Sequence, residues 1–133
     1  MNRRSVVEPI LTKLRTTPFA WGAVDCGLGL AAPVILGLTG KDLGVQFRGK
    51  YSTAAGALKV LRQAGFETVA DVVAAQFDRI PISKAQYGDI AVLEGEDTGV
   101  GLGVVLGERI AVLTPTGYGS IERCKAKWAF RIA

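Results

Sequence analysis

The sequence predicts an α+β fold in which helices come first and a series of short strands follows. Apolar residues recur at three- and four-residue spacing through the first part, about residues 4–77, which is typical of amphipathic helices. In the second part, residues 88–133, short apolar runs alternate with glycine-containing turns, which is typical of strands. The length of 133 residues and the 49% hydrophobic content fit one globular domain over residues 1–133.

The first two predicted helices differ in character. Apolar residues at i, i+3, i+4 and i+7 place an amphipathic helix over residues 4–17, and Pro18 ends it. The segment from Cys26 to about Leu38 is apolar on nearly every face, so we expect a helix buried in the middle of the domain. Asp25 is its expected N-cap, and Pro33 is expected to kink it.

Two shorter helices are expected after the linker KDLGVQFRGKY. Ser52 or Thr53 caps the third helix, and Gly65 closes it. The fourth helix covers about residues 68–76 and directs its valines inward. Both helices therefore belong to the first, helical part of the chain.

The strands are expected in the second part. The stretch YGDIAVLEG predicts a turn at Gly88–Asp89 and a strand over residues 90–94. Two further strands, GVGLGVVLG and RIAVLTP, are joined tightly at Gly107–Glu108. The segments GSIER and WAFRIA are expected to close a small antiparallel sheet.

Composition and charge exclude several classes of function. The net charge of +4 comes from scattered basic residues with no basic stripe between aromatic residues, so we expect no nucleic-acid partner. No segment reaches the roughly 18 apolar residues of a membrane span, and the N-terminus lacks the features of a signal peptide. The chain has two cysteines far apart and no histidine, so we expect free thiols, no metal site and no cofactor.

Cys26 is the candidate nucleophile. It follows the expected N-cap, and the free N–H groups of a helix N-terminus are expected to lower the pKa of a thiol placed there. A buried cysteine is also a common small core residue, so this pattern alone leaves both interpretations open. Because the chain has no histidine, the usual base for a cysteine nucleophile is missing.

The order of these motifs resembles that of the NlpC-type cell-wall cysteine peptidases. The matching residues are DCGL, which holds Asp25 and Cys26, and YGDIAVL, which holds Asp89. This resemblance implies a papain-like fold with N-terminal helices packed on a small antiparallel sheet and with Cys26 at the nucleophile position. It also implies a histidine and a third polar residue on the next two strands, where this chain has Gly101 and Val112.

A second resemblance covers most of the chain from Pro18 onward. The segments PFAWGAVDCGL, LTGKDLGVQFRGKYSTAAGALKVLRQAG, YGDIAV and KAKWAFRI are similar to a subfamily of small proteins encoded in tail-gene clusters of bacteriophages and prophages. Members keep the papain-like frame and the cysteine but lack the histidine. The resemblance implies a virion tail component near the tail tip, assembled in the host cytoplasm, with tail-tip or hub subunits as its partners.

Two functions are therefore expected from the sequence. The first is a structural or accessory tail component built on a catalytically inactive NlpC-type fold. The alternative is a cell-wall cysteine peptidase or amidase that acts on peptidoglycan and uses Cys26 with a non-histidine or partner-supplied base. A thiol redox module is disfavoured because the chain has no CxxC pair.

Other residues have two interpretations each. Trp21 is either the aromatic wall of a vestigial cleft or, as we prefer, a core anchor. Arg48, Lys50 and Tyr51 either contact a neighbouring subunit or form a solvated turn.

For the remaining polar and glycine positions, the simplest structural roles are expected. Asp89 is expected to be a turn residue before a strand. Gly99, Gly101 and Gly103 alternate along one strand. They either leave room for a ligand or another backbone to approach or, as we prefer, let the strand pack tightly against the central helix.

Overall fold

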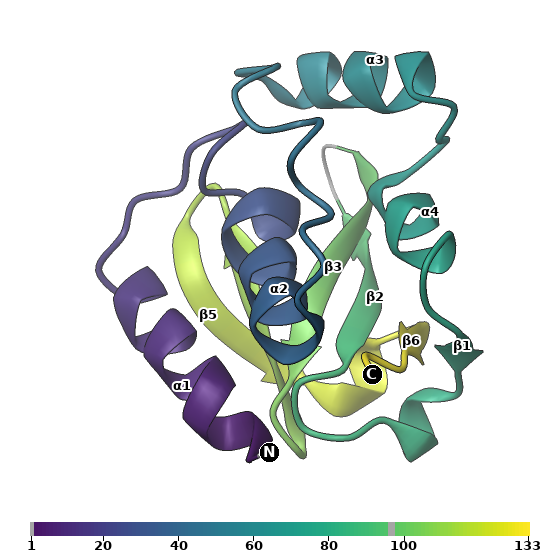
Figure 1. Ribbon diagram of the computed structural model, residues 1–133. Helices are drawn as coiled ribbons and strands as arrows, with labels where there is room; N and C mark the ends of the chain where they lie inside the picture. The colour runs from purple at the N-terminus through teal and green to yellow at the C-terminus, as the bar shows by residue number, and fades with distance from the viewer. Residues whose placement is uncertain (1, 96–97) are drawn as a thin grey trace.

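Helices cover one face of a sheet in the computed structural model, which describes residues 2–95 and 98–133 (Figure 1). The helices are α1 (Arg3–Leu14), the π-helix η1 (Cys26–Ala31), α2 (Ala32–Thr39), α3 (Ala54–Gln63) and α4 (Val69–Ala74). The strands are β1 (Arg79–Ile80), β2 (Ile90–Gly95), β3 (Gly99–Val105), β4 (Arg109–Thr114), β5 (Gly117–Glu122) and β6 (Trp128–Phe130). Two 3₁₀ turns, η2 (Ile82–Lys84) and η3 (Arg123–Lys125), complete the chain. The predicted α+β class is confirmed.

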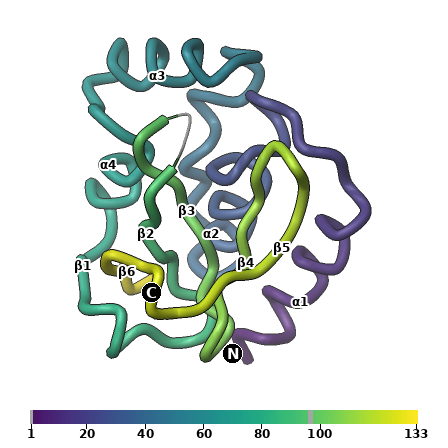
Figure 2. Tube along the Cα trace, turned by 180° about the vertical axis from the view of Figure 1, so that it is seen from behind, coloured from purple at the N-terminus to yellow at the C-terminus, as the bar shows by residue number. Residues whose placement is uncertain are grey.

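The described residues form one six-stranded antiparallel sheet in the order β1-β6-β2-β3-β4-β5. Strand β3 pairs with β2 along its full length but with β4 only at Val104 and Val105. The β4–β5 hairpin diverges from β3 beyond these two pairs (Figure 2). Strand β1 was not expected from the sequence, because a strand of two residues is too short to show an alternation of apolar and polar side chains. None of the helices described is long and apolar enough to cross a membrane.

The two faces of the sheet have separate apolar clusters. Ile90, Val92, Leu102 and Val104 pack against the helices in the main core. Residues that alternate with them, such as Leu93, belong to a smaller cluster on the other face. This follows from the two-residue period of a strand, which directs successive side chains to opposite faces.

The central helix begins as the sequence predicts but does not continue as one α-helix. Asp25 caps it through its side chain, and Gly40 ends it with a positive φ of 80°. The first six residues form the π-helix η1, in which the N–H of Ala32 donates to the carbonyl of Gly27. Pro33 lies in the first turn of α2, where its missing N–H is tolerated. The expected kink at Pro33 is thus replaced by a change of helix type.

The other helices follow their predicted signals with small differences. Helix α1 ends at Leu14 and not at residue 17, and the hydroxyl of Thr17 donates to the carbonyl of Lys13. Thr53, and not Ser52, caps α3 by accepting from the N–H of Gly56. Hydrogen bonds from side chains to the backbone therefore mark the end of α1 and the start of α3.

Asp89 joins the two ends of the chain and is more than a turn residue. Its side chain is fully buried, and its Oδ1 accepts from Arg3 Nη1 at 2.9 Å and from the N–H of Ile132 at 3.0 Å. Its Oδ2 accepts from the N–H of Gln86 at 2.8 Å. Arg3 also donates to the carbonyls of Tyr87 and Ile132. The sequence interpretation of Asp89 was therefore incomplete, because these partners are distant in sequence.

Replacing Asp89 should destabilise the fold strongly. An Asp89→Ala change removes the acceptor for the buried N–H of Ile132 and the partly buried N–H of Gln86. It also leaves Arg3 without its carboxylate, so we expect the free energy of unfolding to fall by about 3 kcal/mol. Urea denaturation of the purified protein measures this. Asp78→Ala, at an exposed position, is the control and should leave the midpoint unchanged. Equal midpoints for the two variants would contradict the assigned role.

Candidate functional site

The buried carboxylate of Asp25 organises the start of η1. Asp25 is only 2% exposed. Its Oδ1 accepts from the N–H groups of Gly27 at 3.1 Å and Leu28 at 2.8 Å, which satisfies the first turn of the helix. Its Oδ2 accepts from the N–H of Gly22 at 3.0 Å and from the hydroxyl of Tyr51 at 2.5 Å. Both oxygens are therefore fully engaged by the protein.

Tyr51 belongs to this site, which the sequence did not indicate. It comes from the loop before α3, and the loop that holds Gly22 approaches it closely. Gly22 has a positive φ of 85°, and a Cβ there would lie 1.9 Å from the carbonyl oxygen of Tyr51. Burial and the neighbouring Asp25 raise the pKa of the Tyr51 hydroxyl far above its usual range. No local spacing could reveal a contact between residues 26 positions apart.

The Cys26 thiol lies in surroundings that disfavour its ionised form. The pKa of Cys26 is raised to about 11, mainly because burial removes the thiol from water and in smaller part because of the nearby Asp25 carboxylate. The backbone N–H groups of Leu102, Cys26 and Gly27 lower the pKa of the thiol, but the effect of desolvation is larger. The expected lowering of the thiol pKa by the helix N-terminus is therefore wrong, because desolvation outweighs it.

Leu102, and not Gly101, lies opposite Cys26 on the sheet. Leu102 lines the same cavity as Cys26, whereas Gly101 pairs with Leu93, whose side chain belongs to the cluster on the other face. Val112, at the expected third polar position, also packs against that other cluster. The two expected catalytic positions are thus neither polar nor directed at the sulfur.

The glycines of β3 do not pack against the central helix, which corrects a second expectation. A Cβ at Gly103 would lie 2.5 Å from Cγ2 of Ile110 and 2.8 Å from the carbonyl oxygen of Ala111, so this glycine permits close packing on β4. A Cβ at Gly99 or Gly101 would meet nothing within 4 Å. The first half of β3 is therefore open on that face.

A small apolar cavity adjoins Cys26. Its volume is about 70 Å³, and it is lined mainly by apolar side chains, among them Trp21, Leu28, Phe47, Leu61, Val72 and Leu102. Ligand pockets in proteins usually measure about 300 Å³ or more, so this space cannot enclose a peptide. The cavity is large enough for only a few atoms.

Trp21 is a wall of this cavity and not a core anchor. It is partly exposed, and its ring packs edge-on against Phe19 with centroids 4.9 Å apart. Phe19, and not Trp21, packs against the main core. The cleft-wall interpretation of Trp21 is the one that fits the structure.

The remaining candidate residues lie apart from the cavity. Asp89 is bound to Arg3 and Ile132. Arg48 is exposed and forms an ion pair with Asp42 at 3.1 Å. Lys50 is exposed as well. Of the three loop residues expected to act together, only Tyr51 reaches the site.

The site offers little for acyl transfer. Such a reaction needs a group that takes the proton of the thiol and later returns it to the leaving group. Among the described residues, the ionisable neighbours of the sulfur are Asp25, whose lone pairs are engaged, and Tyr51, whose raised pKa keeps it protonated. Within residues 2–95 and 98–133, the sulfur therefore faces no group placed to accept its proton.

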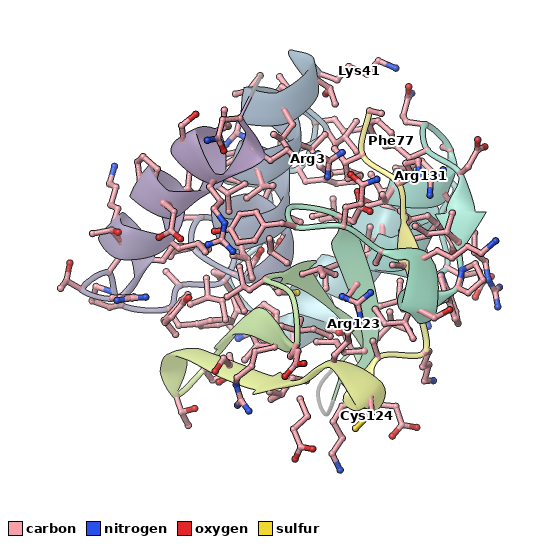
Figure 3. The ribbon with its side chains drawn as sticks, turned by 90° about the horizontal axis from the view of Figure 1, so that it is seen from below. Arg3, Lys41, Phe77, Arg123, Cys124 and Arg131 are labelled. Atoms are coloured by element: carbon pink, nitrogen blue, oxygen red, sulfur yellow. The ribbon has the colours of Figure 1, made fainter. Side chains whose placement is uncertain are left out.

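Cys26 should react slowly with thiol reagents. Cys26 is half-buried, and with a pKa of about 11 only about one thiol in a thousand is ionised at pH 8. Cys124 is exposed and lies at the rim of the molecule (Figure 3). Labelling with a chromogenic disulfide at pH 8 should modify the Cys124→Ser variant far more slowly than the Cys26→Ala variant. Equal rates would contradict the buried environment of Cys26.

The Tyr51 hydroxyl should contribute measurably to stability. A Tyr51→Phe change removes one donor from a buried carboxylate, so the free energy of unfolding should fall by about 1–2 kcal/mol. Tyr118→Phe is a matched control, because that hydroxyl donates to no described residue. Thermal or urea denaturation of both variants measures the difference. A Tyr51→Phe protein as stable as the control would show that the bond is unimportant.

Comparison with known structures finds the same fold in NlpC/p60 domains. The NlpC/p60 domain of the peptidoglycan hydrolase SagA superposes with a TM-score of 0.63 at 18% identity, over 98% of this chain and 99% of SagA's domain. RipD from Mycobacterium tuberculosis, described as a non-catalytic NlpC/p60 domain protein adapted to a peptidoglycan-binding function, gives 0.51 at 14% identity over 100% and 99%. No curated protein matches the chain in sequence.

The expected papain-like NlpC-type fold is therefore confirmed, with helices on a small antiparallel sheet. At these levels of identity the likeness concerns the fold alone. In sequence, the chain matches one described family over residues 2–132. It belongs to that family, the domain of unknown function DUF6950.

Proposed function

We propose that the protein is a catalytically inactive NlpC-type module that serves as a structural or accessory component of a bacteriophage tail, near the tail tip. The tail assignment rests on the resemblance of the segments around Cys26 and before α3 to proteins of phage tail-gene clusters. The inactive state rests on the surroundings of Cys26. In this proposal the module assembles in the host cytoplasm with tail-tip or hub subunits.

The observation that carries the inactive state is the environment of the sulfur. Its proton is held with a pKa of about 11, and Leu102 occupies the side of the cavity that faces it. Loss of a general base typically lowers the rate of such enzymes by several orders of magnitude. Cys26 then acts as a small residue that fills the space between η1 and β3.

The cavity also argues against a role in binding peptidoglycan through this site. RipD is described as adapted to a peptidoglycan-binding function, so an inactive domain of this fold can take that role. Here the space beside Cys26 measures about 70 Å³, and the polar groups in it already bind each other. This space is too small to enclose a stem peptide, which supports an assembly role over peptidoglycan binding.

The proposal predicts no cleavage of peptidoglycan. The purified protein, alone and together with its neighbouring tail proteins, should release no stem peptides from peptidoglycan, because the thiol lacks a proton acceptor. Mass spectrometry of the soluble products measures this, with the Cys26→Ala protein as control. Products that appear with the natural protein and vanish with Cys26→Ala would establish the alternative, a peptidase with a partner-supplied base.

The same variant tests the tail role. Deleting the gene should abolish intact tails, whereas the Cys26→Ala gene should restore them and give the natural plaque titre. Electron microscopy and mass spectrometry of purified particles measure both. Absence of the natural protein from particles would contradict a structural role in the virion.

A further inference from the structure

Strand β5 forms an edge of the sheet that has no partner strand. It is the last strand in the order β1-β6-β2-β3-β4-β5, and Figure 2 shows it on the side of the sheet away from β1. Proteins commonly protect such an edge with a very short strand, a proline or a lysine. Strand β1 has two residues and is followed by Pro81, whereas β5 has six residues and contains neither proline nor lysine. The edge at β5 therefore lacks the protection that the other edge has.

The backbone groups of Tyr118, Ser120 and Glu122 face this edge. In an antiparallel pair, residues whose N–H and C=O groups face the partner strand alternate with residues whose groups face away. The N–H of Arg123 donates to the carbonyl of Glu108, so the odd-numbered residues of β5 face β4 and the even-numbered ones face outward. Among the described residues, no group outside the pairing with β4 accepts from the three outward N–H groups.

One of the outward carbonyls is partly occupied. Arg109 donates from Nη2 to the carbonyl of Ser120 at 2.8 Å and from Nε to the Ser120 hydroxyl at 2.9 Å. A carbonyl oxygen has two acceptor sites, so that of Ser120 can accept a second N–H. The edge therefore presents a row of backbone donors and acceptors, and another extended backbone has the chemistry that satisfies such a row.

We propose that β5 pairs antiparallel with β5 of a second copy of this chain, about a two-fold axis at Ser120. The three outward residues are symmetric about Ser120, so this register places Ser120 opposite Ser120 and Tyr118 opposite Glu122. Every other two-fold register that keeps outward residues opposite one another leaves at least one of the three without a partner in β5. The inference concerns this chain alone and does not rest on the proposed tail role.

The side chains of this register favour a second copy as the occupant. The guanidinium of Arg15 lies over the Tyr118 ring, 5.7 Å from its centroid. Arg15 and Glu122 are both exposed, and neither forms an ion pair with a described residue. Opposite residues have Cβ atoms about 5 Å apart, so Glu122 of the partner subunit comes beside the ring over which Arg15 lies. The two-fold axis forms this contact twice, with each copy supplying one cation and one carboxylate.

A cysteine placed on the proposed axis tests the register. In a Cys124→Ser background, Ser120→Cys should form a disulfide-linked dimer on mild oxidation. The reason is that α-carbons of a hydrogen-bonded antiparallel pair lie about 5.5 Å apart, within the range that a disulfide spans. Ser52→Cys, at an exposed serine outside β5, is the matched control and should remain monomeric. Non-reducing electrophoresis measures both. No cross-link at Ser120, or as much at Ser52, would overturn the proposal.

Sedimentation measurements test the role of the backbone. The natural protein should form a dimer, and Ser120→Pro should raise its dissociation constant by about tenfold or more, because proline removes an N–H that faces the edge and none that faces β4. Ser120→Ala loses the same hydroxyl but keeps the N–H, so it should change the constant by less than about threefold. A natural protein that stays monomeric at roughly millimolar concentration, or equal effects of the two variants, would contradict the pairing.

A charge reversal keeps the proposal testable if Ser120→Pro does not fold, which a thermal melt shows. Arg15→Glu places a second carboxylate beside Glu122 of the partner subunit, so the dissociation constant should rise about fivefold. Lys13→Glu makes the same change of charge at an exposed position that faces away from residue 15 on α1, and it should have little effect. Equal effects of the two reversals would show that Arg15 lies outside the contact and would overturn the register.

Discussion

The buried carboxylate of Asp25 is the interaction on which the site depends. One carboxylate satisfies the first turn of η1, fixes the loop at Gly22 and holds the hydroxyl of Tyr51. Three segments distant in sequence thereby meet at one residue that is nearly inaccessible to water. Because an unsatisfied carboxylate in such a place would be very unfavourable, all three segments are held together or none is.

The position of Cys26 follows from that arrangement. The residue after the cap must lie at the start of η1, and η1 packs directly against β3. Strand β3 pairs with β4 only at Val104 and Val105, so Leu102 has no partner on β4 and lines the cavity beside Cys26. Cys26 therefore packs between the helix and the sheet. The burial that results raises the pKa of its thiol and so suppresses its reactivity.

The fold has a firmly packed part and a less embedded part. The main core lies between the helices and the sheet, and the contact of Arg3 and Asp89 joins the two ends of the chain around it. Helix α3 packs instead through a small cluster with Leu28, Phe47 and Val72. Helix α3 is therefore held by a cluster separate from the main core.

The sequence by itself determined the fold class, the helix start at Asp25 and the stop at Gly40, and it narrowed the start of α3 to Ser52 or Thr53. It could do so because apolar period, capping and positive φ are local properties. It also determined that this chain supplies no histidine to assist Cys26. Only the tertiary structure decided which side chains face the sulfur. The pleat of β3 places Leu102, and not Gly101, on the face of the sheet beside Cys26, because successive residues of a strand point to opposite faces. Contacts between residues distant in sequence brought Tyr51 to Asp25 and buried Asp89. The pKa of the Cys26 thiol depends on desolvation by all of its neighbours, and this effect outweighs the local effect of the helix N-terminus.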